Sequence, residues 1–250
     1  MRPKLRLYSY LLIILNLLML SGCASLNHTP ESHDPWERMN RSIYSFNDTV
    51  DHYALEPVAK GYRAITPNLV EHGVSNFFSN LWDIKVFVND VLQLKPVQAS
   101  ADLGRFLLNS TVGIAGVVDV ASKVGLEKHH EDIGQTLAHW GVASGPYVVL
   151  PFLGPSTVRD GFGLGVDVVY LDPLQYVNDQ GTQNALYALA FVDVRASLLE
   201  ATDILDEAAL DRYTFVREAY LQRRQSLIHD GVLPPAADMP DDEKIDIFSD

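Results

Sequence analysis

Three charged residues stand out in a stretch that is otherwise apolar and rich in glycine and proline. Arg159, Asp160 and Asp167 follow the Gly-Pro turn of "GPYVVLPFLGPSTVRDGFGLG", which spans 145–165. Asp167 comes seven residues after Asp160, nearly two helical turns, so both carboxylates fall on one helix face. Charged groups beside an apolar wall suit a ligand with a charged headgroup and acyl tails. The same residues also fit a solvated helix start, where the helix dipole favours Asp160.

The other residue types that could do chemistry form no recognisable catalytic site. The chain has no G-x-S-x-G elbow, no H-E-x-x-H zinc motif and no G-x-x-x-x-G-K phosphate loop. The cluster "HHED" at 129–132 consists of adjacent residues, which do not converge on one metal ion, so it indicates a polar connection. We therefore expect a protein that is not an enzyme and that needs neither a metal nor a cofactor.

The only cysteine, Cys23, follows a short apolar run in "LSGCASL". Arg2, Lys4 and Arg6 precede that run, and small residues stand directly before the cysteine. A basic start, a short apolar run and small residues are typical of an export signal, and the run is too short to span a bilayer comfortably. We assign 1–22 as a signal peptide. The alternative is a buried free cysteine behind an anchor helix.

The pattern Leu-Ser-Gly-Cys resembles the bacterial lipobox. By that resemblance Cys23 becomes the first residue of the mature protein, acylated with fatty acids such as palmitate on its sulfur and its new amino group. The next residue is Ala24 rather than aspartate, which by the same resemblance favours sorting to the outer membrane, facing the periplasm. With Cys23 so used, no cysteine remains for a disulfide or a thiol catalyst.

The chain is acidic, with 32 Asp and Glu residues against 19 Lys and Arg residues and a net charge of −13. Removal of 1–22 takes away three basic and no acidic residues and makes the charge more negative. Such a chain repels nucleic acid, whose binding depends on basic contacts. It is equally unsuited to electrostatic capture by anionic lipids, so any membrane contact must be apolar.

Composition divides the mature chain into a polar tether at 23–33, one folded domain at 34–230 and an acidic disordered tail at 231–250. We expect Asp34 to cap the first helix, and Pro57, Pro67 and Pro96 each to mark a helix start. Further helices are expected at 68–81, 82–94, 182–205 and 208–229, with a glycine- and proline-rich irregular segment at 145–165 that leads into a helix near Thr157. The predicted class is all-α, and this pattern alone fits either a globular bundle or a ring of amphipathic helices.

Several motifs resemble the MlaA/VacJ family of outer-membrane lipoproteins. They are "DPWERMNRSIYSFN" from Asp34, "RFLLNSTVGIAGVVDVA" from Arg105, "GQTLAHWGVASGPYVVLPFLGPSTVRD" at 134–160 and, weakly, "REAYLQRR" at 217–224. The resemblance covers nearly the whole mature chain except the tether and the tail.

The resemblance implies a single all-α domain whose helices form a ring in the periplasmic leaflet of the outer membrane. A central amphipathic channel would let mislocalised phospholipid leave the outer leaflet and reach a soluble periplasmic carrier of the Mla pathway. Association with a trimeric porin is also implied. We expect this function, which maintains lipid asymmetry. The alternatives are a structural lipoprotein that tethers porins without lipid passage and a phospholipid hydrolase.

The resemblance also suggests site residues. It puts Arg159, Asp160 and Asp167 on the headgroup path. The expected channel wall or gating region comprises Phe46, Asn47, Gly113, Gly116, Tyr147 and Phe152. Arg223 and Arg224 near the last helix end either solvate a helix face or dock the carrier.

Overall fold

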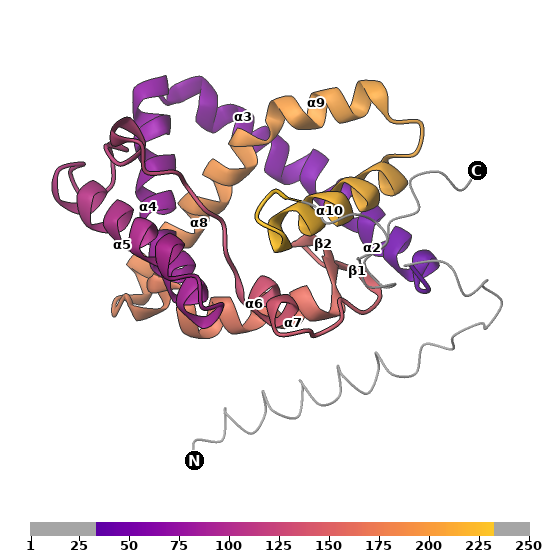
Figure 1. Cartoon of the computed structure of the whole chain (residues 1–250). Helices are drawn as coiled ribbons and strands as arrows, with labels where there is room; N and C mark the ends of the chain where they lie inside the picture. Colours follow the sequence, from indigo (N-terminus) through magenta and orange to yellow (C-terminus); the bar gives the residue numbers. More distant parts are fainter. Residues whose placement is uncertain (1–33, 233–250) are drawn as a thin grey trace, which may run out of the picture.

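The computed structural model describes residues 34–232. The assigned signal peptide, Cys23, the tether and nearly all of the acidic tail lie outside the described residues. Within them, helices are joined by short connections and by one two-stranded hairpin (Figure 1). The all-α expectation is confirmed, with the hairpin falling in the segment expected to be irregular.

The first helical segment is longer than the sequence suggested. Helix α2 (Glu37–Val50), a π-helical turn (Asp51–Leu55) and α3 (Glu56–Ile65) follow one another without a break. The expected helix start at Pro57 is confirmed, because α3 begins at Glu56 with Pro57 in its first turn, although no gap separates α3 from the π-helical turn before it. Pro57 has no N–H for the helix ladder, and the wider turn just before it accommodates the missing bond.

Asp34 does not cap α2, whose first flanking residue is Trp36. The Asp34 side chain is buried instead and accepts hydrogen bonds from Asn40 (2.7 Å) and from the hydroxyl of Tyr213. Arg217 lies 3.4 Å from the same carboxylate. The start of the domain is thus tied to the last helix.

Helix α4 (Asn68–Leu92) replaces the two helices expected at 68–81 and 82–94, because no glycine or proline interrupts the chain between them. The helix starts at Pro67 and Pro96 are confirmed: Pro67 flanks α4, and Pro96 is the first residue of α5 (Pro96–Thr111). Helices α4 and α5 pack against each other over much of their length (Figure 1).

A long connection runs from Val112 to Asp132 and carries only a short 3-10 turn (Ser122–Val124). In Figure 1 it descends from the end of α5 to α6 (Ile133–His139). Gly113 and Gly116 lie in the tight turn at its start. A Cβ on Gly113 would come within 2.2 Å of the Val118 carbonyl oxygen, so the turn itself requires glycine there.

The hairpin consists of β1 (Tyr147–Leu150) and β2 (Gly154–Thr157), paired antiparallel with Tyr147 opposite Thr157 and Leu150 opposite Gly154. Helix α7 (Val158–Val166) follows directly and continues into a π-helical turn (Asp167–Leu171) and a 3-10 turn (Pro173–Tyr176). The expected extended segment and the helix start near Thr157 are confirmed.

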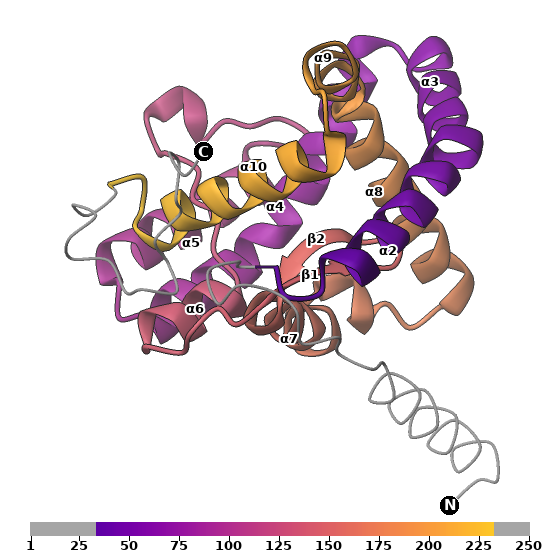
Figure 2. The same ribbon diagram turned by 90° about the vertical axis from the view of Figure 1, so that its right-hand side faces the viewer.

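The remaining helices are α8 (Gln180–Ser197), α9 (Leu199–Ala208) and α10 (Arg212–Ile228). The single helix expected at 182–205 is broken at Leu198, so that α8 and α9 both reach α3. Figure 2 shows α10 lying beside the hairpin, with α2 on the hairpin's other side.

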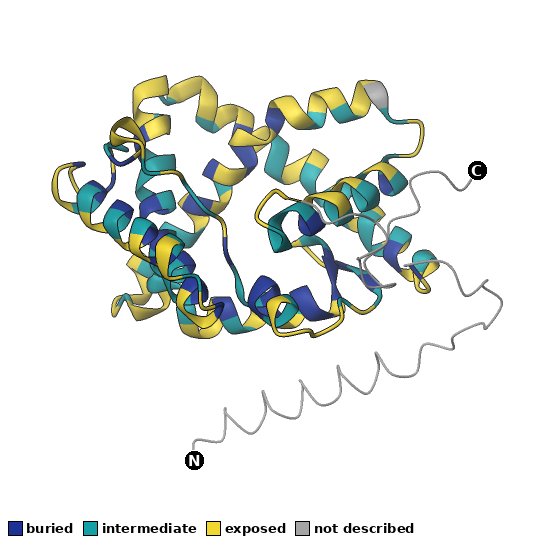
Figure 3. Ribbon diagram, viewed as in Figure 1, coloured by how far each residue is buried: buried dark blue, intermediate teal, exposed yellow. Residues whose placement is uncertain are grey.

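The interior is unusually polar. Among the described residues, buried polar and charged side chains outnumber buried apolar ones, and the apolar core is divided into three small clusters. Large apolar side chains are exposed on most elements, and exposed segments alternate with buried ones along nearly every helix (Figure 3). This distribution is the reverse of the one expected for a domain surrounded by water.

The turn at Gly116 gives a test of the fold. Gly116 and Gly125 have nearly equal φ angles of +87° and +86°, but only at Gly116 would a Cβ meet Asn80, at 2.6–2.9 Å. We expect Gly125→Ala to lower the free energy of unfolding by about 1–2 kcal/mol, the cost of left-handed backbone in a residue with a Cβ. Gly116→Ala should cost about 1–3 kcal/mol more, because it adds a steric clash. Urea denaturation measures both values, and equal losses would contradict the observed packing of the turn.

Candidate functional site

Two asparagines of α2 hold the hairpin as a neighbouring strand would. Asn40 donates to the Tyr147 carbonyl (3.0 Å) and accepts from the Val149 amide (2.9 Å). Asn47 repeats the pattern seven residues later, donating to the Leu150 carbonyl (2.9 Å) and accepting from the Phe152 amide (2.8 Å). A spacing of seven puts both amides on one helix face. Helix α2 therefore fixes both the strand and the tip of the hairpin.

The hairpin tip presents apolar side chains outward. Phe152 has a φ angle of +64°, a conformation that residues with a Cβ rarely adopt, and Asn47 bonds to its amide. Its ring meets that of Phe46 edge-on at a centroid distance of 5.2 Å. Phe46, Phe152 and Leu153 are all exposed. The structure thus brings together Phe46, Asn47 and Phe152, three of the residues that the sequence singled out.

Behind the hairpin lies a buried network of ion pairs centred on Arg224 of α10. Its guanidinium bonds to both carboxylate oxygens of Asp132 at 2.6 and 2.7 Å and to Asp160 at 3.0 Å. Asp160 also accepts from the hydroxyl of Tyr220 (2.9 Å) and from Arg159 (3.0 Å). The network joins the starts of α6 and α7 to α10.

The opposite charges of Asp132 and Arg224 stabilise each other's ionised form. Burial alone would raise the pKa of Asp132, but the hydrogen bonds and charge of Arg224 lower it to about 2. Burial would lower the pKa of Arg224, but the carboxylates of Asp132 and Asp160 outweigh this effect and raise it. Asp132 and Arg224 therefore both remain charged at neutral pH.

Asp167 lies close to this network without joining its ion pairs. It is buried in the π-helical turn and accepts a hydrogen bond from the Ile133 amide (3.2 Å), next to Asp132 in the chain. Burial raises the pKa of Asp167 to about 6, although the charge of Lys85 opposes the shift. None of Arg159, Asp160 and Asp167 has an exposed charge, so the headgroup path on these residues stays a prediction.

Two other expectations need correction. Tyr147 is not on a wall: it is 1% exposed and packs edge-on against Tyr213 and Tyr220 in one of the apolar clusters. Arg223 and Arg224 do not share a surface, because Arg223 is exposed whereas Arg224 is buried in the network. Adjacent residues of a helix point about 100° apart, so two neighbouring arginines need not lie on the same surface. The sequence alone does not show which of the two faces the interior.

Sequence reasoning missed an apolar pocket of about 400 Å³ between α4, α8 and the connection. All of its lining residues are apolar: Leu69, Val70, Gly73, Val74, Phe77, Phe78, Val117, Leu186 and Leu189. Its volume lies in the usual range for small-ligand pockets. The two-faced pattern of α4 predicts an apolar helix face that could line a pocket. The sequence does not show that α8, which is far away in the chain, forms the opposite wall.

The described residues contain no group of three or more His, Cys, Asp or Glu side chains placed to hold a metal ion. No helix among them is both long enough and apolar enough to cross a bilayer. The "HHED" cluster is indeed dispersed: His129 meets Asp102, Glu131 meets Lys95, and Asp132 caps α6.

The Arg224 network gives a stability prediction. Arg224→Met removes the cation that pairs with Asp132 and with the buried Asp160, and should lower the free energy of unfolding by about 3–5 kcal/mol near neutral pH. Arg223→Met is the matched control and should change it by less than about 0.5 kcal/mol, because Arg223 is exposed. Chemical denaturation of the mature protein measures both.

The same variant, Arg224→Met, tests how the free energy of unfolding depends on pH. The folded-state pKa of Asp132 lies below its ordinary value of about 4, so the stability it contributes is present above about pH 4. It is lost as the pH falls from about 4 to about 2. Arg224→Met should lose this component of the acid dependence, whereas a variant with an unchanged acid slope would rule out the pairing.

Comparison with known proteins agrees with this architecture. The family model described as MlaA lipoprotein matches residues 32–227. The intermembrane phospholipid transport system lipoprotein MlaA of Escherichia coli K12 is 37% identical over 93% of this chain and 92% of its own length. The protein of the same name from Haemophilus influenzae is 35% identical over 92% and 94%. A solved structure from work on the maintenance of bacterial outer membrane lipid asymmetry superposes with a TM-score of 0.67 at 36% identity, covering 78% of this chain and 98% of the other. The chain belongs to the MlaA lipoprotein family.

Proposed function

We propose that this protein is an outer-membrane lipoprotein that removes mislocalised phospholipid from the outer leaflet and passes it to a soluble periplasmic carrier. The observation that carries the proposal is the match, over more than nine-tenths of the chain, to lipoproteins of the intermembrane phospholipid transport system. Removing stray phospholipid in this way would maintain the lipid asymmetry of the membrane.

The distribution of polarity supports a membrane setting. Apolar side chains at the hairpin tip, on α7 and in the π-helical turn are exposed, whereas Arg224 and Asp160 are buried and paired. Exposed apolar surface is stable against acyl chains, and charges that leave water must be paired. A domain set among the acyl chains of the periplasmic leaflet satisfies both conditions without a spanning helix.

The apolar pocket between α4 and α8 is the best candidate for acyl-chain contact. Its lining offers no hydrogen-bonding side chain, so a peptide backbone there would leave polar groups unsatisfied. Hydrocarbon has no such requirement. The helices would form a ring around an amphipathic channel, and the headgroup would travel along its polar side. We assign Arg159, Asp160 and Asp167 to that polar side, where they would become accessible when the buried network opens.

The remaining assignments follow the same reasoning. Cys23 carries the lipid anchor, a trimeric porin is the membrane partner, and Arg223 is the exposed candidate for carrier docking. The chain is a passive conduit rather than an enzyme, so transport direction is set by its partners.

Photo-crosslinking of the mature protein to labelled diacyl phospholipid in detergent tests lipid binding. Val70 lines the pocket and is 52% exposed, so Val70→Trp should obstruct the pocket without overpacking the interior. We expect the crosslinked lipid to fall about tenfold, equivalent to a loss of about 1.4 kcal/mol in binding. Val58→Trp is the control, because Val58 is 54% exposed on α3 and does not line the pocket.

The products separate the rival functions. Intact diacyl lipid that depends on Val70 supports transport. Lysophospholipid would identify a hydrolase, and an absence of crosslinked lipid would favour a lipoprotein that only tethers porins.

The hairpin tip is tested in cells. Phe152→Asp places a charge on a side chain that is 59% exposed at the proposed lipid-facing tip. Inserting that charge among acyl chains costs about 2–4 kcal/mol, so outer-leaflet phospholipid should accumulate in the variant strain. Phe215→Asp, at a side chain 51% exposed on α10, should leave the level unchanged. Normal phospholipid levels with Phe152→Asp at normal protein abundance would remove the tip from the path.

A further inference from the structure

The carboxylate of Asp193 on α8 is buried and has no cation beside it. It is 5% exposed, and its two oxygens accept hydrogen bonds from the hydroxyl groups of Ser75 on α4 (2.8 Å) and Tyr62 on α3 (3.2 Å). Among the residues that the structure describes, no lysine, arginine or histidine forms an ion pair with it. Two hydroxyl groups fill about two of the roughly four acceptor positions of a carboxylate. The group can therefore accept from a further donor.

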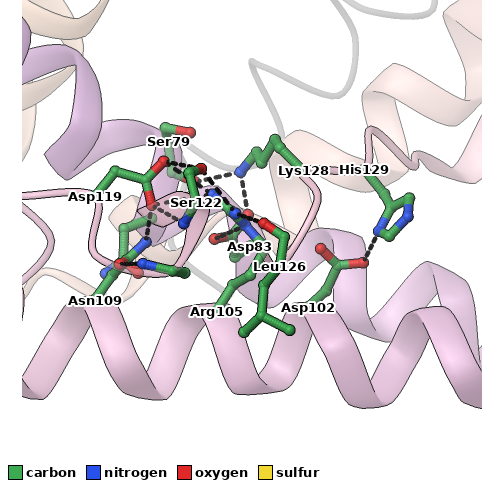
Figure 4. Close-up of polar contacts among 12 residues, drawn as sticks. Ser79, Asp83, Asp102, Arg105, Asn109, Asp119, Ser122, Leu126, Lys128 and His129 are labelled. Atoms are coloured by element: carbon green, nitrogen blue, oxygen red, sulfur yellow. Dashed lines mark hydrogen bonds and ion pairs between the residues drawn. The ribbon is translucent and has the colours of Figure 1, made fainter. Parts of the chain in front are cut away.

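Two other buried carboxylates, Asp83 and Asp102, each have a basic partner. Lys128 bonds to Asp83, and Nδ1 of His129 lies 2.8 Å from Asp102 (Figure 4). Such pairing offsets the free energy that a carboxylate loses when it leaves water. Hydroxyl groups carry no net charge, so they offset that loss only in part. The carboxylate of Asp193 is therefore suited to a ligand that brings a positive charge.

The two arginines nearest in the chain, Arg63 and Arg195, pair with other carboxylates. Arg63 lies 3.6 Å from Glu71 and 3.1 Å from Glu200. Arg195 bonds to both oxygens of Asp51, at 2.6 and 2.7 Å. Counted with the buried carboxylate, these groups carry four negative and two positive charges. The surroundings of the buried carboxylate therefore attract a cation.

Helix periodicity places Asp193 at one end of the apolar pocket. Leu186 and Leu189 line the pocket, and Asp193 follows them by seven and four residues, so the three side chains lie on one face of α8. About one helical turn, roughly 5–6 Å along the axis, separates Asp193 from Leu189. On α4, Ser75 directly follows Val74, which also lines the pocket. The carboxylate thus adjoins the apolar lining without being part of it.

The side chains that cover the carboxylate can share it with a ligand. Tyr62 and Ser75 are both half-buried, and each meets Asp193 through a hydroxyl group. A hydroxyl group can donate or accept and rotates to suit its partner. A ligand that supplies its own donors can therefore reach the carboxylate without leaving either hydroxyl group unsatisfied.

We propose that Asp193 binds the ammonium group of a phospholipid while one of its acyl chains occupies the adjoining pocket. A primary ammonium group supplies three N–H donors and the positive charge that the site lacks. The inference rests on the proposed function and names its substrate class. Phospholipids with an amino headgroup, such as phosphatidylethanolamine, are bound in preference to those without one, such as phosphatidylglycerol.

Competitive photo-crosslinking of the mature protein tests the inference. Diacyl phosphatidylethanolamine and phosphatidylglycerol, with the same acyl chains and distinguishable labels, are mixed at equal concentration in detergent. We expect the wild-type protein to capture about tenfold more phosphatidylethanolamine, because a hydrogen bond to a charged group is strong enough for a preference of this size.

Three variants separate headgroup binding from a merely structural contact. Asp193→Asn keeps the size of the side chain and can bond to both hydroxyl groups, so it should remove the preference without lowering the capture of phosphatidylglycerol. Asp203→Asn is the matched control, because Asp203 is exposed on the neighbouring helix α9 and its loss changes the net charge equally. It should keep the preference. Ser75→Ala removes one hydroxyl group but leaves the charge, so it should also keep the preference, whereas a structural clasp predicts that it behaves like Asp193→Asn.

The outcomes separate this inference from the proposed function. Equal capture of the two lipids by the wild-type protein, or a preference that survives Asp193→Asn, would overturn the inference and leave the proposed function in place. Failure to capture either lipid would overturn both.

A further comparison uses only the wild-type protein. Phosphatidylcholine has the net charge of phosphatidylethanolamine but no N–H donor in its headgroup, so its capture should be several-fold lower. Equal capture of these two lipids would show that Asp193 accepts no hydrogen bond from the headgroup.

Discussion

The buried guanidinium of Arg224 is the interaction on which the rest of the architecture depends. It connects α10 to Asp132 at the start of α6 and to Asp160 at the start of α7. Gly134 makes the close approach possible, since a Cβ there would lie 2.4 Å from the guanidinium. A buried charge without its partners is costly, so the last helix, the hairpin and α7 hold their positions together or not at all. The neighbouring contact of Asp34 with Tyr213 and Arg217 extends the same dependence to the first described residue.

Such an interior would solve a problem that the proposed membrane setting creates. Apolar side chains gain little by turning inward when the outside is also apolar, so burial alone does not specify which helices meet. Hydrogen-bonded ion pairs have defined partners and geometry. Pairs such as Arg195 with Asp51, at 2.6 and 2.7 Å, can therefore define the arrangement of helices that share no large apolar core.

Proline positions and apolar periodicity in the sequence predict where most helices begin. They do not predict which side chains from distant parts of the chain form ion pairs. Pro67 and Pro96 mark helix starts because proline lacks an N–H that the first turn does not need. The same rule holds at Pro57, which stands in the first turn of α3, directly after the π-helical turn. Family resemblance located Phe46, Asn47 and Phe152, which do meet in space. It could not tell that Arg224 is inside and Arg223 outside, because that depends on Asp132, which is 92 residues away in the chain.

The asparagines of α2 have a consequence for neighbouring copies of the protein. Two-stranded hairpins leave open backbone groups along each outer edge, and such edges invite pairing with a strand of another molecule. Asn40 and Asn47 occupy the donors and acceptors of one edge, from Tyr147 to Phe152. A helix offers no backbone groups for a further strand to extend. This edge is thereby protected against edge-to-edge association between copies of the chain.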